Sequence, residues 1–209
     1  MTSILRVVLD INIYVRLAKA KHQRRTGTAA QRIFSSLASG QISGRPAQIV
    51  VSHRMLDTLT QVLTRLSVPA EHAEEIQRAL LDAMRCGPEE LDPHLILGGA
   101  PDPSFRDVED GGVMATAFGA RAHVLVTDNL DDFATRDCEV YETALIRSPN
   151  GSERRLKCLV VGRPDRREVL VVHPVDFALW IGDSFDPTPK NVRTRYTKAP
   201  VARGSGKRR

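Results

Sequence analysis

Hydrophobic positions along the chain fall into short continuous runs separated by longer amphipathic stretches. The runs at Val7–Leu9 and Val124–Thr127 lack polar alternation, which is typical of parallel strands buried on both faces. Ala47–Val51 ends in β-branched residues and is predicted to be another strand, and Leu95–Leu97 is a further short candidate. The pattern therefore predicts a sheet of mainly parallel strands.

The stretches between these runs carry apolar residues at helical spacing. A helix is predicted over 29–39, because Thr28 suits an N-cap and Gly40 suits the residue that ends a helix. Ser52 is a second candidate N-cap, and the helix after it presents one apolar face. Further helices are predicted over 71–86 and from Asp107 or Glu109-Asp110 onward, with a turn or short helix over 16–21.

The C-terminal third shows a different pattern. Two β-rich runs, 156–161 and 169–172, are joined by a polar connection and predict a hairpin with one arm in the main sheet. A last short helix is predicted from His173 to about Trp180, with little regular structure beyond Gly182.

Strands that alternate with helices predict an α/β fold in three layers, α/β/α, around a mostly parallel central sheet. We expect one domain over 1–182, with a hairpin-like insert at 134–168. The segment 183–209 is expected to be a basic, disordered tail.

Composition narrows the class of protein. The 42% hydrophobic and 26% charged residues are ordinary for a soluble globular domain, and no apolar run reaches the length of a membrane span. The start of the chain lacks the pattern of a signal peptide. The three cysteines are too few and too scattered for a disulfide framework, so the reducing cytoplasm is the expected location.

Positive charge is concentrated at the C-terminal end. Eight of the basic residues lie from Lys190 onward without any acid, and removing these eight from the net charge of +5 leaves −3 for the rest. Basic tails of this kind often bind nucleic acid. A solvated end without a partner is an equally valid interpretation.

Acidic residues follow two of the predicted strands. Asp10 ends the first strand, the turn 128–132 follows the strand at 124–127, and Asp110 opens the helix between them. In a parallel sheet these places can share one edge, where ligands bind. Converging carboxylates repel one another unless a cation neutralises them, and oxygen ligands without His or Cys suit Mg²⁺ or Mn²⁺. Such a site can hydrolyse phosphodiesters.

Each acid also has a purely structural interpretation. Asp10 could simply bond a neighbouring loop, and Asp110 could stabilise a helix N-terminus through the macrodipole. The turn acids could be solvated. The spacing of Asn12 after Asp10 favours metal binding for the first acid.

Five segments in this order resemble the PIN-domain ribonucleases, most closely the bacterial toxins of type II toxin–antitoxin pairs. They are VVLDINIYV at 7–15, IVVSHRMLDTLTQVL at 49–63, RDVEDGGVMATA at 106–117, VLVTDNLDDF at 124–133 and VLVVHPVDF at 169–177. The resemblance implies a PIN-like fold and a metal-dependent endoribonuclease that uses Mg²⁺ or Mn²⁺. It also implies a homodimer that a cognate antitoxin protein inhibits.

Residue by residue, the resemblance is uneven. Asp10 and Asp110 match two of the family's acids, whereas Thr58 stands where the family usually has Glu, and Asn129 replaces the fourth acid. The expected catalytic residues are Asp10, Asp110, Asn129 and Asp132, and the expected metal ligands are Asp10, Asp110 and Asp128. Supporting roles are expected for Asn12, Ser52, Thr58, Asp107 and Thr127.

Substrate binding and activity are the remaining expectations. Arg24 and Arg25 are predicted to guide RNA phosphates, and the low aromatic content of 5% argues against binding by base stacking. Because Thr58 and Asn129 remove charge, a degenerate PIN fold that binds RNA or protein without cleaving it is the alternative.

Overall fold

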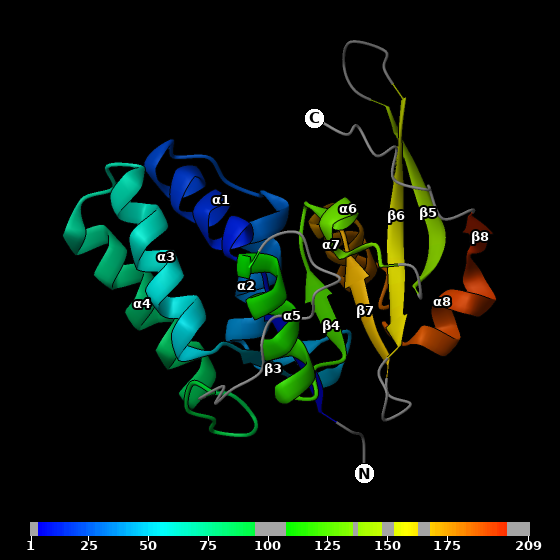
Figure 1. Ribbon diagram of the computed structural model, residues 1–209, viewed down its shortest axis with the longest axis horizontal. Helices are drawn as coiled ribbons and strands as arrows, with labels where there is room; N and C mark the ends of the chain where they lie inside the picture. The colour runs from blue at the N-terminus through cyan, green and yellow to red at the C-terminus, as the bar shows by residue number, and fades with distance from the viewer. Residues whose placement is uncertain (1–3, 95–107, 136–137, 148–152, 163–167, 200–209) are drawn as a thin grey trace.

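The computed structural model describes residues 4–94, 108–135, 138–147, 153–162 and 168–199. Figure 1 shows one mixed sheet with helices on both sides. The strand order is β2-β3-β1-β4-β7-β6-β5-β8, and the four strands β3, β1, β4 and β7 run parallel. The predicted α/β class and mainly parallel centre are confirmed.

The elements have the following bounds. The strands are β1 Leu5–Leu9, β2 Gln41–Ile42, β3 Arg45–Val50, β4 Val124–Val126, β5 Glu139–Arg147, β6 Glu153–Gly162, β7 Glu168–Val172 and β8 Thr197–Ala199. The helices are α1 Ile11–His22, α2 Ala29–Ala38, α3 His53–Arg65, α4 Ala70–Arg85, α5 Val108–Gly119, α6 Leu130–Phe133, α7 Pro174–Gly182 and α8 Pro189–Arg195.

Connections on either side of β1 distribute the helices over two faces. The crossover from β1 to β3 contains α1 and α2, and the crossover from β3 to β4 runs in the opposite direction through α3, α4 and α5. Since crossovers between parallel strands are right-handed, the two crossovers pass over opposite faces of the sheet. The two sets of helices also meet, because α1 packs against α3. α2 contacts α7, and α5 contacts β1 and β4, which completes three layers.

Local sequence explains most of these elements. Val7, Val8 and Leu9 are fully buried, as a strand covered on both faces requires. Thr28 caps α2 in a capping box with Gln31, and the Ser52 hydroxyl accepts a hydrogen bond from the Met55 amide at the start of α3. The predicted caps are therefore confirmed.

The first helix is longer than predicted. α1 begins at Ile11, immediately after β1, whereas the sequence suggested only a turn or short helix over 16–21. The reason is the Asp10 side chain, which accepts a hydrogen bond from the Ile11 amide and caps the helix directly at the strand end. The predicted strand Leu95–Leu97 and Asp107 lie outside the described residues.

The prediction of little regular structure after Gly182, with a disordered tail over 183–209, is wrong for residues 183–199. α8 and β8 form there, and β8 pairs with β5 at the sheet edge. Val192 is fully buried, and the Trp180 indole donates a hydrogen bond to the Tyr196 hydroxyl at 2.7 Å. These contacts bury apolar surface that the local sequence, rich in basic residues, does not reveal.

The predicted hairpin of β6 and β7 is confirmed, and β5, which was not predicted, extends the sheet beside it. β6 pairs with β7 only from Cys158 onward, opposite Val172. Its first five residues, 153–157, pair with β5 and continue past the carboxyl end of β7 (Figure 1). At 3.4 Å per residue this arm extends about 17 Å beyond that edge of the sheet.

Candidate active site

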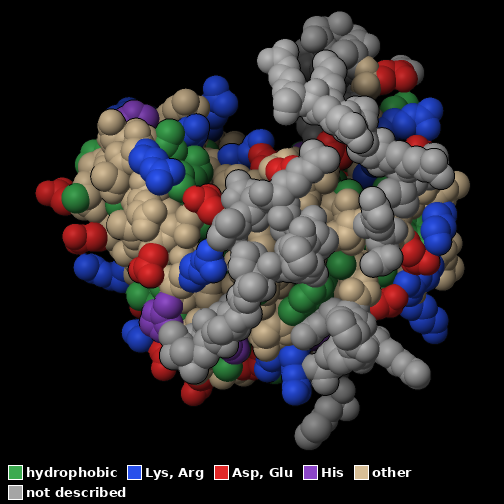
Figure 2. All heavy atoms as spheres, viewed as in Figure 1, with side chains coloured by type: hydrophobic (Ala, Val, Ile, Leu, Met, Phe, Trp, Pro, Cys, Tyr) green, Lys and Arg blue, Asp and Glu red, His purple; other side chains and the backbone are tan. Residues whose placement is uncertain are grey.

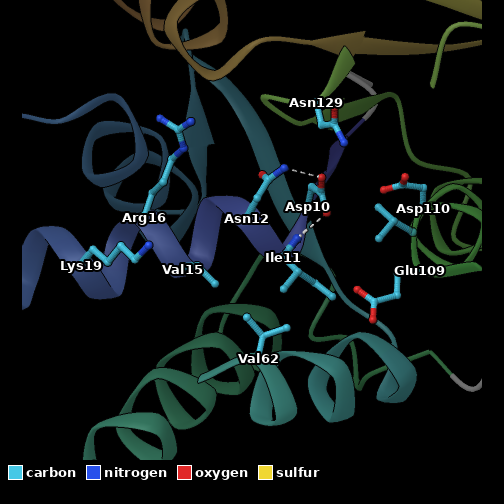
Figure 3. A pocket seen from close by; sticks show the side chains of 11 residues that line it. Asp10, Ile11, Asn12, Val15, Arg16, Lys19, Val62, Glu109, Asp110 and Asn129 are labelled. Carbon is cyan, nitrogen blue, oxygen red and sulfur yellow. Dashed lines mark hydrogen bonds between the residues drawn. The ribbon is translucent and has the colours of Figure 1, made fainter. Parts of the chain in front are cut away.

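The candidate site lies at the carboxyl ends of β1 and β4, between α1 and the first turn of α5 (Figure 3). A cleft of about 410 Å³ opens there. Its size is within the range of clefts that hold small ligands. The lining residues are Asp10, Ile11, Asn12, Val15, Arg16, Lys19, Val62, Glu109, Asp110, Val113 and Asn129.

Asp10 occupies the centre of this cleft and is held on both of its carboxylate oxygens. Oδ1 accepts a hydrogen bond from the Ile11 amide at 2.6 Å, and Oδ2 accepts one from the Asn12 side chain at 2.8 Å. The residue is 6% exposed. The carboxylate is therefore fixed in orientation at the point where β1 becomes α1.

Thr127 ties the ends of β1 and β4 together. Its hydroxyl donates a hydrogen bond to Asp10 Oδ2 at 2.6 Å and accepts one from the backbone N–H of Asn129 at 3.1 Å. Thr127 is fully buried. One side chain thus positions both Asp10 and the loop that carries Asn129.

Burial raises the pKa of the Asp10 carboxyl above its usual range. Desolvation is the largest cause, and the negative charge of Glu109 adds to it. The hydrogen bonds from Thr127, Ile11 and Asn12 act in the opposite direction because they stabilise the charged form. A cation in the cleft would offset this electrostatic cost.

The first turn of α5 brings two more carboxylates to the cleft. Asp110, predicted from the sequence, lines it together with Glu109 and Val113, which lie at helical spacing. Glu109 was not among the predicted site residues. The available signal was its place beside Asp110, in an acidic pair that was interpreted only as the start of a helix.

Asn12 contributes an oxygen that lacks a partner among the described residues. Its amide nitrogen donates to Asp10 and lies 3.2 Å from the Thr127 hydroxyl, while its Oδ1 is buried without a hydrogen bond. A buried unpaired oxygen is costly and is a natural place for a donor or a cation. With the carboxylates of Asp10, Glu109 and Asp110, it forms an oxygen-rich set of the kind that suits Mg²⁺ or Mn²⁺.

The side chains of the β4–α6 loop turn to other partners. The carboxylate of Asp128 forms an ion pair with Arg16, and Asp128 is not part of the cleft lining, although it was predicted as a metal ligand. The Asp132 carboxylate accepts a hydrogen bond from the Asn129 side chain. Asn129 itself lines the cleft, whereas Asp132 does not and contacts the site only through the Asn129 side chain.

Two of the residues with predicted supporting roles, Ser52 and Thr58, do not line the cleft. The Ser52 hydroxyl accepts a hydrogen bond from Thr116 at 2.9 Å, which joins the start of α3 to α5. Thr58 is half-buried on α3, one turn before Val62, and only Val62 reaches the lining. Asp57, the residue before Thr58, is exposed on α3.

Basic residues of the cleft come from α1 rather than from the loop after it. Arg24 and Arg25, the predicted phosphate contacts, are exposed beyond the end of α1. At 1.5 Å per residue, that end lies about 18 Å along the axis from Asp10. Arg16 and Lys19 line the cleft itself, and sequence reasoning missed both because the region was not expected to be one continuous helix.

No group of three or more His, Cys, Asp or Glu side chains within the described residues is already arranged to hold a metal ion. No helix in the described part of the chain is long and apolar enough to cross a membrane.

Comparison with known protein families agrees with this architecture. The family described as PIN domain matches residues 6–131, more than half of the chain, and the match includes β1, α3, the first turn of α5 and the β4–α6 loop. No curated protein and no solved structure matches the sequence. PIN domains are generally nucleases that use divalent metal ions, and the match bears on that class of activity rather than on a particular substrate. On its sequence match and its fold, this chain belongs to the PIN-domain family.

Proposed function

We propose that this protein is a divalent-metal-dependent endoribonuclease that hydrolyses phosphodiester bonds in RNA. The observation that carries the proposal is that three carboxylates, Asp10, Glu109 and Asp110, line one cleft at the sheet edge. The PIN-domain family supports the nuclease class. RNA as the substrate rests on the resemblance to the family's ribonucleases.

Mg²⁺ or Mn²⁺ would be held by oxygen atoms that line the cleft. These are the carboxylate oxygens of Asp10, Glu109 and Asp110, Asn12 Oδ1 and the side-chain amide oxygen of Asn129. When bound, such an ion supplies positive charge at a phosphoryl oxygen and promotes deprotonation of water. Thr127 and the Ile11 amide keep the Asp10 carboxylate in a single orientation. Asp132 orients the Asn129 side chain at the rim of the cleft.

A cleavage assay tests this function. Purified protein is incubated with a labelled RNA in Mg²⁺, in Mn²⁺ and in EDTA, and compared with Asp10→Asn and Asp110→Asn. We expect cleavage only with metal and a loss of more than about 100-fold in both variants, because even residues that merely orient metal ligands cost 10–100-fold. Asp57→Asn is the matched control, since Asp57 is an exposed carboxylate on α3 outside the cleft. Full activity in Asp10→Asn would contradict the proposal.

The second candidate is a PIN fold that binds RNA or protein without cleavage. It is favoured by the neutral residues Thr58 and Asn129 and by the raised pKa of Asp10, because each weakens the attraction for a cation. Calorimetric titration with Mn²⁺ separates the two functions. Binding that Asp10→Asn abolishes supports the enzyme, and absence of binding up to millimolar Mn²⁺ supports the binding module.

The toxin role, with a cytoplasmic location, a homodimer and an antitoxin partner, is proposed from the resemblance alone. Induced expression in a bacterial host is expected to arrest growth, whereas Asp10→Asn is expected to be harmless. Gel filtration with light scattering measures the oligomeric state. Normal growth during expression of active protein would contradict the toxin role but leave the nuclease proposal intact.

A further inference from the structure

Charges in the cleft are separated into two walls around Asp10. Figure 3 shows Glu109 and Asp110 of α5 on one side of Asp10, and Arg16 and Lys19 of α1 on the other. An acidic wall alone would repel a polyanion. The basic wall beside it can attract the phosphates that flank the bond undergoing cleavage.

The basic wall results from the helical repeat of α1. At 100° per residue, Arg16 and Lys19 lie within about 40° of Asn12 around the helix axis, so all three face the cleft. Along the axis they stand about 9 and 14 Å from Asp10. Lys21, in contrast, lies about 180° from Asn12, and its ammonium group pairs with Glu75 of α4 at 2.9 Å.

The two cations of the wall differ in how they are held. The guanidinium of Arg16 pairs with Asp128, which directs it to the rim near the β4–α6 loop. Lys19 is exposed and makes no salt bridge or side-chain hydrogen bond within the described residues, so its ammonium group remains available to an anion. An exposed ammonium without a protein partner is suited to a backbone phosphate, which it contacts without regard to sequence.

The described part of the surface in this view offers no comparable basic area. Figure 2 shows Lys and Arg side chains interspersed with Asp and Glu on the described part of this face, rather than gathered in one broad patch. Among the described residues of this face, attraction for RNA therefore depends on cations close to the cleft. The cleft volume of about 410 Å³ is that of a small-ligand site, which suits one strand rather than a duplex.

We propose that Arg16 and Lys19 bind consecutive backbone phosphates of a single-stranded RNA on one side of the scissile phosphate. The substrate strand then runs along α1, from the N-terminus of the helix at Asp10 toward its C-terminal end. This inference rests on the proposed function for its substrate class. It assigns binding roles to two residues outside the acidic set.

Binding in EDTA tests the inference without cleavage. The affinity of a fluorescein-labelled single-stranded RNA is measured by anisotropy over a range of salt concentrations for wild type, Arg16→Ala, Lys19→Ala and Lys21→Ala. Loss of one phosphate contact is expected to reduce the salt slope by about 0.7 and to weaken binding roughly five-fold at 0.1 M salt. Lys21→Ala removes the same charge from the opposite side of α1, and we expect wild-type affinity and slope for it.

The failures of the inference and of the function are distinguishable. If Arg16→Ala and Lys19→Ala bind RNA as wild type does, the inference is overturned even when the protein cleaves RNA. If both variants lose affinity and slope while wild type cleaves nothing in Mn²⁺, the phosphate contacts stand and the nuclease function fails. In an active enzyme the two variants should raise KM with little change in kcat, because they remove binding that is uniform along the reaction.

Discussion

The Thr127 hydroxyl donates a 2.6 Å hydrogen bond to Asp10 Oδ2 across the neighbouring parallel strands β1 and β4. Both residues are buried at the strand ends, Thr127 completely. The bond acts against the desolvation that raises the pKa of Asp10. The ionised state of the central carboxylate therefore depends on a neutral residue from another strand.

Replacing Thr127 tests this dependence. In Thr127→Val the pKa of Asp10 should rise further, so the acid limb of the pH–rate profile should move to higher pH. Loss of a buried hydrogen bond to a charged group should also lower the free energy of unfolding by about 1–3 kcal/mol. Thr127→Ser keeps the hydroxyl and is expected to retain the wild-type profile. An unshifted acid limb in Thr127→Val would show that this bond does not tune Asp10.

Asp10→Asn is expected to separate stability from activity. The folded-state pKa of Asp10 is raised, so the folded protein favours the protonated carboxyl, and stability from this group is present below the unfolded pKa of 3.8 and lost as pH rises through the folded pKa. At pH 7 the neutral amide removes that cost. We therefore expect Asp10→Asn to unfold at the same or a higher denaturant concentration than wild type while cleavage is lost. A large loss of stability at pH 7 would contradict this.

The buried hydroxyl of Tyr14 gives a prediction about stability. Tyr14 of α1 is 1% exposed, and its hydroxyl has no hydrogen-bond partner among the described residues. Because an unpaired buried hydroxyl costs about 1–3 kcal/mol, Tyr14→Phe should leave stability unchanged or raise it. Chemical denaturation measures the difference. A clear destabilisation would show that the hydroxyl has a partner, such as a buried water.

The ordered segment after Gly182 should contribute measurably to the free energy of unfolding. Val192 on α8 is fully buried, and truncating it to Ala should cost about 1–3 kcal/mol through lost burial and the cavity that remains. Thr194→Ala is the control, because Thr194 is exposed on the same helix. Equal unfolding midpoints for the two variants would mean that α8 does not pack as described.

Much of the fold was accessible from local patterns. The strands at Val7–Leu9 and Val124–Thr127 can be predicted from the sequence because burial on both faces requires an uninterrupted apolar run. β5 escaped prediction because its residues, 139–147, mix charged and apolar types and its register shifts between Glu142 and Ala144, which disturbs the alternation. α8 and β8 escaped because their apolar contacts are with distant residues such as Trp180.

The sequence by itself determined the α/β order of elements and the positions of Asp10, Asn12, Asp110 and Asn129 at one sheet edge. Those features follow from burial patterns and from the rule that parallel strands end at a common edge. Only the tertiary structure decided that Asp128 pairs with Arg16, that Glu109 joins the cleft, and that α1 supplies its basic wall. Side-chain partners depend on which elements approach each other in space and at what angle. The order of charges along the sequence does not specify the distances between residues that are far apart in the chain.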